Sequence, residues 1–240
     1  MINTEFKNRP VGEIVSENYH AAGVFREFNI DFCCGGHKTL GEVVAKKGID
    51  VSEVEEKLKG LTWGVSSGAE NYKDWTPDFL IDYIEQTHHR FVRQKSEEIK
   101  AYAAKVARVH GERHPENIEI FKNFSALTVE LLNHLEEEEN KVFPLIKELY
   151  RQSKEGVAVS EKQQDQLREE LDAMLSEHED AGGLMAEIRE LSNQFTPPGD
   201  ACTTYRILYQ NLDGFEQDLH KHVHLENNIL FKKAENLLKN

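Results

Sequence analysis

The chain has 240 residues, enough for one ordinary domain and a small second one. Asp and Glu number 43 against 29 Lys and Arg, and the net charge of −14 argues against binding nucleic acid or anionic lipid while it suits cations. Only three cysteines occur, and no apolar run has the length of a signal peptide or a membrane span, so we expect a cytoplasmic protein.

Residues 1–62 are expected to form a small helical domain. Helical patterns run from Val11 to Phe28 and from Leu40 to Leu58, with the turn-forming Cys33-Cys34-Gly35-Gly36 between them. Cys33 and Cys34 are candidate redox or functional thiols if they stand at a helix N-terminus, where the dipole lowers a thiol pKa. In a tight turn they would be small buried residues, and the pattern does not choose between the two. Residues 63–75, rich in Gly and Ser, have the composition of a domain linker.

Residues 76–240 contain four long segments with the apolar spacing of amphipathic helices and no strand signals. Short connections between long helices favour antiparallel neighbours, so we predict an all-α fold in which an up-down-up-down four-helix bundle follows the small domain. The third segment opens with Ser160 and Gln163 at capping-box spacing. The segments run from about Thr76 to His110, from His114 to Tyr150, from Ser160 to just before Pro197, and from Thr203 to Leu238.

Two of the apolar stripes contain a histidine and a glutamate four residues apart. The pairs are His134 with Glu138 and His222 with Glu226, and this spacing places an imidazole and a carboxylate on one helix face. A buried ionised carboxylate is retained only when it is paired or bound to a metal. The two pairs therefore predict metal ligands.

The other two helices offer further imidazoles. His178 falls on the buried side of the third segment, and the first segment offers His88 or His89, of which the apolar stripe favours His88. His89 to His134 spans 45 residues and His178 to His222 spans 44, but this near-repeat does not decide between the two neighbours. His110, His114, His220 and His224 lie off the stripes or in loops and are expected to be exposed.

The near-repeat extends to the residues around each pair. Glu138-x-Asn140-x-x-Phe143 matches Glu226-x-Asn228-x-x-Phe231, which predicts a duplicated helical hairpin and a dinuclear centre. Nitrogen and oxygen donors suit Fe, Mn or Zn, and open positions on such a pair could bind O2, peroxide or nitric oxide. Glu130 and Glu177 are candidates for a supporting or proton-delivery role as well as for the surface. Three of the four residues Glu136 to Glu139 are expected to be solvated.

Taken together, these segments resemble the repair-of-iron-centres family, which are hemerythrin-like di-iron proteins associated with iron-sulfur cluster repair after oxidative or nitrosative damage. The similarity covers nearly the whole chain. The matching pieces are Asp31-Phe32-Cys33-Cys34-Gly35-Gly36, His88-His89, Val106-Ala107-Arg108-Val109-His110, His134-x-x-x-Glu138 with Val142-Phe143-Pro144, Ser176-Glu177-His178, Thr196-Pro197-Pro198 with Ala201-Cys202-Thr203-Thr204, and His222-x-x-x-Glu226-Asn227-Asn228.

The resemblance implies two iron ions with oxo and carboxylate bridges. By it, His89 rather than His88 binds iron, His134, His178 and His222 are the other imidazole ligands, and Glu138 and Glu226 are the bridges. Fewer histidines than in oxygen-carrying hemerythrins argue against reversible oxygen storage. The resemblance also implies that Cys33 and Cys34 contribute to function or to a homodimer formed through the N-terminal domain.

The leading hypothesis is a stress protein that restores damaged iron-sulfur proteins, its partners, by supplying iron or by consuming nitric oxide near them. One alternative is an enzyme that reduces nitric oxide or peroxide at the di-iron site without delivering iron. Another is a module that senses oxygen or nitric oxide and signals through the N-terminal domain.

Overall fold

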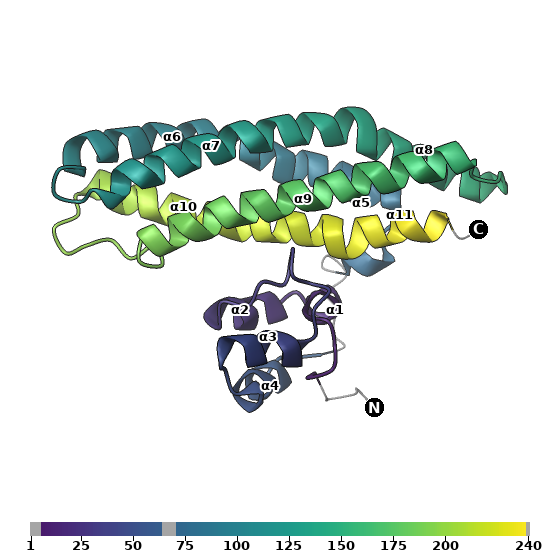
Figure 1. Cartoon of the computed structure of the whole chain (residues 1–240), viewed down its shortest axis with the longest axis horizontal. Helices are drawn as coiled ribbons and strands as arrows, with labels where there is room; N and C mark the ends of the chain where they lie inside the picture. The colour runs from purple at the N-terminus through teal and green to yellow at the C-terminus, as the bar shows by residue number, and fades with distance from the viewer. Residues whose placement is uncertain (1–5, 64–70, 239–240) are drawn as a thin grey trace. The chain divides into compact units, whose positions relative to one another are not determined.

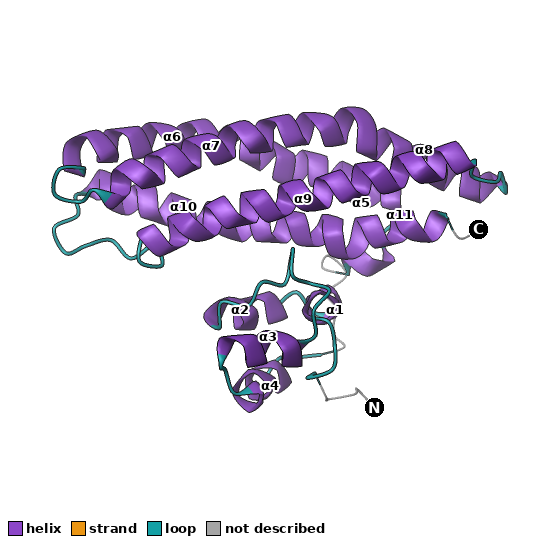
Figure 2. Ribbon diagram, viewed as in Figure 1, coloured by secondary structure: helices purple, strands orange, loops and turns teal. Residues whose placement is uncertain are grey.

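The computed structural model describes residues 6–63 and 71–238, and within these ranges the chain forms helices and no strands (Figure 2). The predicted all-α class is confirmed. None of the described helices combines the length and the apolarity that crossing a membrane requires. The chain folds into two compact units: unit 1 contains Met1–Ile81, Leu149–Val159 and His220–Asn240, and unit 2 contains Asp82–Glu148 and Ser160–Leu219.

Unit 2 is built from four long helices that pack as an up-down-up-down bundle, as predicted. Figure 1 shows them running side by side. Phe215 of the fourth helix packs against the second and the first: its ring centroid is 5.2 Å from that of Phe124 and 6.1 Å from that of Phe91. Arg189 forms an ion pair with the buried Glu216. The helices are α6 (Arg90–His110), α7 (Glu116–Glu137), α9 (Glu161–Leu191) and α10 (Thr203–Leu225), the last of which belongs to unit 2 as far as Leu219.

The longest helix, α9, begins with the predicted capping box. The Ser160 hydroxyl accepts the N–H of Gln163 at 3.3 Å, and the Gln163 side chain accepts the N–H of Ser160 at 3.1 Å. The helix ends at Leu191, before Pro197 as expected, because three successive residues adopt positive φ. They are Asn193, Gln194 and Phe195.

The other three long helices each contain a π turn that the 3.6-residue periodicity did not predict. A π turn inserts one extra residue into an α-helix and is frequent at functional sites. The three turns are η2 (Glu85–His89) between α5 (Pro77–Ile84) and α6, η3 (Glu138–Val142) between α7 and α8 (Phe143–Glu155), and η4 (Glu226–Leu230) between α10 and α11 (Phe231–Leu237).

In unit 1, each of the two expected helical stretches is broken into two helices. The first becomes α1 (Val11–Glu17) and α2 (Ala21–Glu27), and the second becomes α3 (Leu40–Lys47) and α4 (Val51–Lys59). Gly48 ends α3 in the left-handed conformation, at φ 67°, and the Asp50 side chain then caps α4 by accepting the N–H of Ser52. A helical pattern continued across a glycine and a capping aspartate therefore overestimated the helix length.

The predicted linker, residues 63–75, is only partly described. Residues 64–70 lie outside the described residues, and those that follow include a short 3-10 helix, η1 (Tyr72–Asp74), with Tyr72 buried. Before the gap, Trp63 packs on Phe6 with ring centroids 5.1 Å apart. The division of the chain at this segment stays a prediction.

Unit 1 joins the two ends of the chain. Its C-terminal part is the end of α10 with η4 and α11, and it contacts the N-terminal helices. The Asn228 side chain donates to the backbone carbonyl oxygens of Phe32 at 3.3 Å and Cys33 at 3.0 Å. The turn that carries the adjacent cysteines is therefore fixed to the helix that carries His222 and Glu226.

Candidate metal centre

Within unit 2, four of the predicted ligands lie close together. Glu138 Oε2 is 3.3 Å from His89 Nε2 and 3.4 Å from His134 Nε2. His178 Nε2 is 2.9 Å from His134 Nε2, and donor atoms of His134, Glu138 and His178 all lie within 4.8 Å of one another. Three helices thus bring imidazole nitrogens and a carboxylate to one point.

These four side chains are almost completely buried. His89 and Glu138 have no exposed surface, and His178 and His134 are 2% and 5% exposed. An ionised carboxylate at such a position requires a compensating cation because the interior solvates it poorly. Imidazole nitrogen and carboxylate oxygen without thiolate are donors that Fe, Mn and Zn accept. The donor set therefore fits a metal ion.

The outer nitrogens of two of these imidazoles are held by carboxylates. His89 Nδ1 lies 2.7 Å from Glu139 Oε1, and His134 Nδ1 lies 2.7 Å from Glu177 Oε2. An ionised carboxylate can only accept, so each Nδ1 donates the proton and, in the neutral imidazole, each Nε2 keeps a lone pair that is directed inward. This is the tautomer that metal binding needs.

Glu139, which holds the His89 ring, was expected from the sequence to be one of the solvated acids. Arg93 donates to both of its carboxylate oxygens, at 2.7 and 3.0 Å. Burial raises the pKa of Glu139, but the bonds to Arg93 and His89 outweigh that effect and hold the pKa below its ordinary value. The carboxylate therefore stays ionised behind His89.

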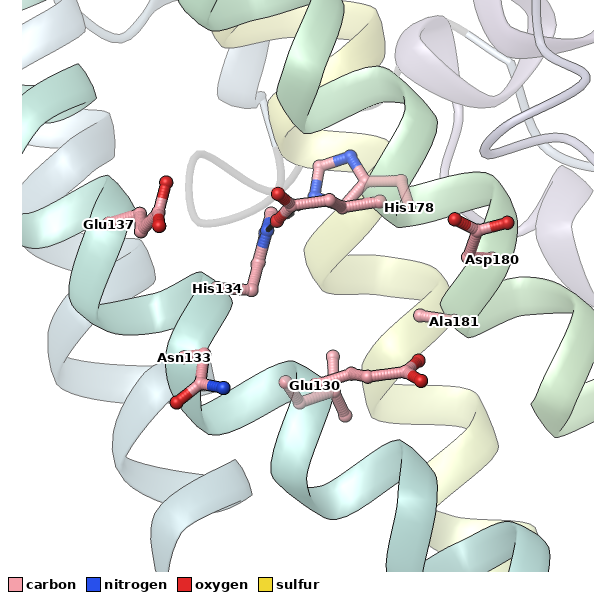
Figure 3. A pocket seen from close by; sticks show the side chains of 9 residues that line it. Glu130, Asn133, His134, Glu137, His178, Asp180 and Ala181 are labelled. Atoms are coloured by element: carbon pink, nitrogen blue, oxygen red, sulfur yellow. Dashed lines mark hydrogen bonds and ion pairs between the residues drawn. The ribbon is translucent and has the colours of Figure 1, made fainter.

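A cavity of about 240 Å³ lies beside the His134 and His178 pair. Figure 3 shows the two imidazoles pointing toward one another from α7 and α9. Glu130 and Glu177 both line this cavity, and Glu177 makes the contact to His134 described above, whereas Glu130 is exposed on the cavity wall. Glu137 and Asp180 also line it, so its wall is acidic.

Unit 1 contains the second histidine–glutamate pair. His222 Nε2 lies 2.8 Å from Glu226 Oε1, and both residues are at most 1% exposed. The local structure is that of the first pair: His222, like His134, lies in the last turn of an α-helix, and Glu226, like Glu138, opens a π turn. The repeat in sequence is therefore also a repeat in structure.

The two neighbouring histidines of the first helix have different surroundings. His88 Nδ1 lies 2.9 Å from Asp218 Oδ1, and its ring meets Tyr83 edge-on at 5.6 Å, while Glu138 lies beside His89. Both are buried because the π turn η2 places two successive residues on the inner side of the helix. A stripe counted at 3.6 residues per turn could not represent this.

The expectation that His224 is exposed was wrong. It is 1% exposed, and its ring packs against Phe32 at 5.7 Å and Tyr19 at 6.2 Å. In unit 1 the N-terminal residues cover the face of α10 that carries it, so a face off the bundle stripe is still buried. Burial lowers the pKa of His224 to about 3 and keeps the ring neutral.

Cys33 and Cys34 lie in a turn and not at the start of a helix, since α3 begins only at Leu40. Asp31 caps this turn: its Oδ1 accepts the N–H groups of Cys33 and Cys34 at 2.9 and 3.1 Å, and its Oδ2 accepts that of Gly35 at 2.7 Å. Cys33 is buried and Cys34 half-buried. The sequence left both settings open, and the structure shows the turn.

Comparison with known proteins gives two family matches that together span most of the chain. Residues 80–234 match the hemerythrin HHE cation binding domain, and residues 7–62 match a domain of unknown function named ScdA_N. The iron-sulfur cluster repair protein ScdA of Staphylococcus haemolyticus is 33% identical over 93% of this chain and 96% of its own length. The iron-sulfur cluster repair protein YtfE of an Enterobacter species is 34% identical over 95% of this chain and 97% of its own length.

Proposed function

Since this chain belongs to the family of iron-sulfur cluster repair proteins with a hemerythrin-type cation binding domain, we propose that it repairs damaged iron-sulfur clusters by supplying iron from a di-iron centre. The partners would be proteins whose clusters oxidants or nitric oxide have damaged. One observation carries the proposal: two buried histidine–glutamate pairs, related by an internal repeat, each lie where an α-helix passes into a π turn.

The proposed ligands are the six residues that the repeat and the family motifs select, namely His89, His134, Glu138, His178, His222 and Glu226. In unit 2, Glu138 lies between His89 and His134, as a bridging carboxylate would. In unit 1, His222 lies in the last turn of α10 and Glu226 opens η4, 2.8 Å from His222. Cations held by Glu138 and Glu226 would neutralise these buried acids.

The division of roles follows from the side chains. The imidazoles would hold the ions, and the rings of His89 and His134 are kept in orientation at Nδ1 by Glu139 and Glu177. Glu138 and Glu226 would supply carboxylate oxygens to the ions from fixed helix positions. A bound iron pair would supply exchangeable coordination positions. The acidic cavity beside His134 and His178 favours a cation leaving or entering there.

The decisive measurement combines metal analysis with iron transfer. The isolated protein should contain two iron ions per chain with the Mössbauer signature of a coupled pair. Under anaerobic conditions it should transfer iron to an acceptor protein stripped of its cluster. His134→Ala and Glu138→Ala should each lose most of the bound iron, whereas Glu136→Ala, in the same acidic run but exposed, should retain it.

Two outcomes would contradict the proposal. Full iron content in Glu138→Ala would remove that residue from the ligand set. Repeated turnover of nitric oxide or peroxide with all iron retained, and no transfer to the acceptor, would identify a reductase in place of an iron donor.

A further inference from the structure

We propose that Asp31, Cys33 and Cys34 form a second metal site, a thiolate–carboxylate site for one divalent ion of intermediate softness, separate from the histidine–glutamate centre. The identity of its occupant as Fe²⁺ in transit rests on the proposed function. The site itself rests on the turn described above.

The donor atoms of the three residues already lie together. One carboxylate oxygen and the two sulfur atoms are within 4.8 Å of one another. The Cys33 thiol donates to Asp31 Oδ1 at 3.1 Å, and the backbone N–H groups of Cys33, Cys34 and Gly35 fix the carboxylate in this orientation. This five-residue turn therefore presents three ligands together, and the backbone does not have to rearrange to bring them close.

The chemistry of the donors selects the class of ion. Thiolates favour Fe²⁺, Co²⁺, Zn²⁺ and Cd²⁺ over the hard ions Mg²⁺ and Ca²⁺. The pKa of Cys33 lies well above its ordinary value, because Cys34 is hydrogen-bonded to it, because it is buried and because Asp31 is close. The thiol therefore stays protonated and unreactive in the absence of metal, in contrast with a nucleophilic cysteine.

Binding would release two protons and move no electrons. The S–H bonds of Cys33 and Cys34 break as two metal–sulfur bonds form, and the protons pass to solvent. Asp31 Oδ1 loses the hydrogen bond from Cys33 in the same step and becomes available as the third ligand. Three protein ligands leave at least one coordination position open, which suits an ion that is passed on and not stored.

The solvent exposure of the three ligands increases across the site, as is expected where a metal ion moves between the interior and solvent. Cys33 is buried, Cys34 is half-buried and Asp31 is exposed. On the buried side, Asn228 donates to the carbonyl oxygen of Cys33 and lies two residues after Glu226 on η4. The turn is thus attached to the helix segment that carries two proposed iron ligands, and both lie in unit 1.

The test uses Co²⁺ as the probe on the full-length, iron-loaded protein, reduced by a phosphine under anaerobic conditions. We expect one Co²⁺ per chain in addition to the iron, with the near-ultraviolet charge-transfer band of cobalt–thiolate bonds. The double variant Cys33→Ser, Cys34→Ser should lose both the extra cobalt and the band while it keeps its iron. Cys202→Ser, which removes the exposed thiol of unit 2, should behave as the unaltered protein.

A second measurement does not depend on how well the double variant folds. Cd²⁺ should protect Cys33 and Cys34, but not Cys202, from alkylation in the unaltered protein, as read by mass spectrometry. Absence of an additional equivalent of cobalt, or equal alkylation of Cys33 and Cys34 with and without Cd²⁺, would overturn the proposal. His134→Ala separates the two sites: loss of bundle iron with the cobalt band retained leaves this site standing even if the di-iron function fails.

Discussion

Carboxylates behind two of the proposed ligand imidazoles, His89 and His134, determine which ring nitrogen would be available to a metal. Glu139 and Glu177 each accept a proton from an Nδ1 atom at 2.7 Å, and the lone pair of the opposite nitrogen then faces Glu138 or His178. Glu139 is further fixed by Arg93. The orientation of His89 is thereby linked, through one acid, to a charge on the outer surface of α6.

We expect Glu139→Gln to weaken iron binding about 10- to 100-fold, because loss of such a hydrogen-bond partner typically reduces metal affinity by that factor. The amide can still contact His89 but no longer carries the charge that fixes its tautomer. Iron affinity measured by competition with a chelator tests this. Glu136→Gln removes an exposed acid of the same run and is the matched control. Equal affinity in the two variants would show that Glu139 does not support the site.

The role of Glu139 could not be predicted from its position in the sequence. Four consecutive acids, Glu136 to Glu139, cover all sides of a regular helix, and only the residue on the apolar stripe was assigned inward. The π turn that begins at Glu138 changes the direction in which the next residues point. Glu139 therefore reaches His89, whereas a regular helix would have directed it elsewhere.

Among the helices, the three π turns follow a common rule. His89 ends one, and Glu138 and Glu226 each open one, while α9 contributes His178 from an unbroken helix. An extra residue in a helix is unfavourable unless something compensates, and π turns are frequent at functional sites. We interpret the three turns as the backbone adjustment that directs these ligands inward.

Deleting Lys141, an exposed residue of η3, should convert that π turn into regular α-helix. The helix content, measured by far-ultraviolet circular dichroism, should hardly change because only one helical residue is lost. Bound iron should fall sharply, because the Glu138 carboxylate is redirected. Lys141→Ala keeps the chain length and should retain its iron. If the deletion variant bound iron normally, the π turn would not be needed for the site.

The parts of the fold that the sequence predicted are those in which one rule acts alone. Apolar stripes of constant period in four long segments predict the bundle, and Ser160 with Gln163 predicts the start of α9; both are confirmed. Where the backbone deviates from a regular α-helix, or another segment covers a helix face, the hydrophobic period predicts the wrong burial. The inserted residues of the π turns and the burial of His224 by N-terminal residues are two cases, since neither leaves a mark in the local hydrophobic pattern.

At the scale of the whole molecule, the Asn228 side chain is one of the links between the N-terminal and C-terminal parts of unit 1. Asn228 holds the carbonyl oxygens of Phe32 and Cys33, and two glycines leave room for it. A Cβ atom at Gly36 would lie 2.4 Å from Asn228 Oδ1 and 2.7 Å from the Phe32 carbonyl oxygen, and one at Gly12 would lie 2.3 Å from Asn228 Oδ1. The close approach of the cysteine turn to η4 thus requires residues without side chains.

We expect Gly36→Ala to destabilise unit 1 by about 1 to 3 kcal/mol, the range for forcing an extra group into a packed interior. Gly23→Ala is the control, because a Cβ there meets no atom within 4 Å and its position inside α2 should give a gain of about 0.5 to 1 kcal/mol. Both tryptophans, Trp63 and Trp75, belong to unit 1, so their fluorescence during urea unfolding reports on this unit. Equal stability of the two variants would mean that the turn and η4 separate at little cost, and that Asn228 does not hold the chain ends together.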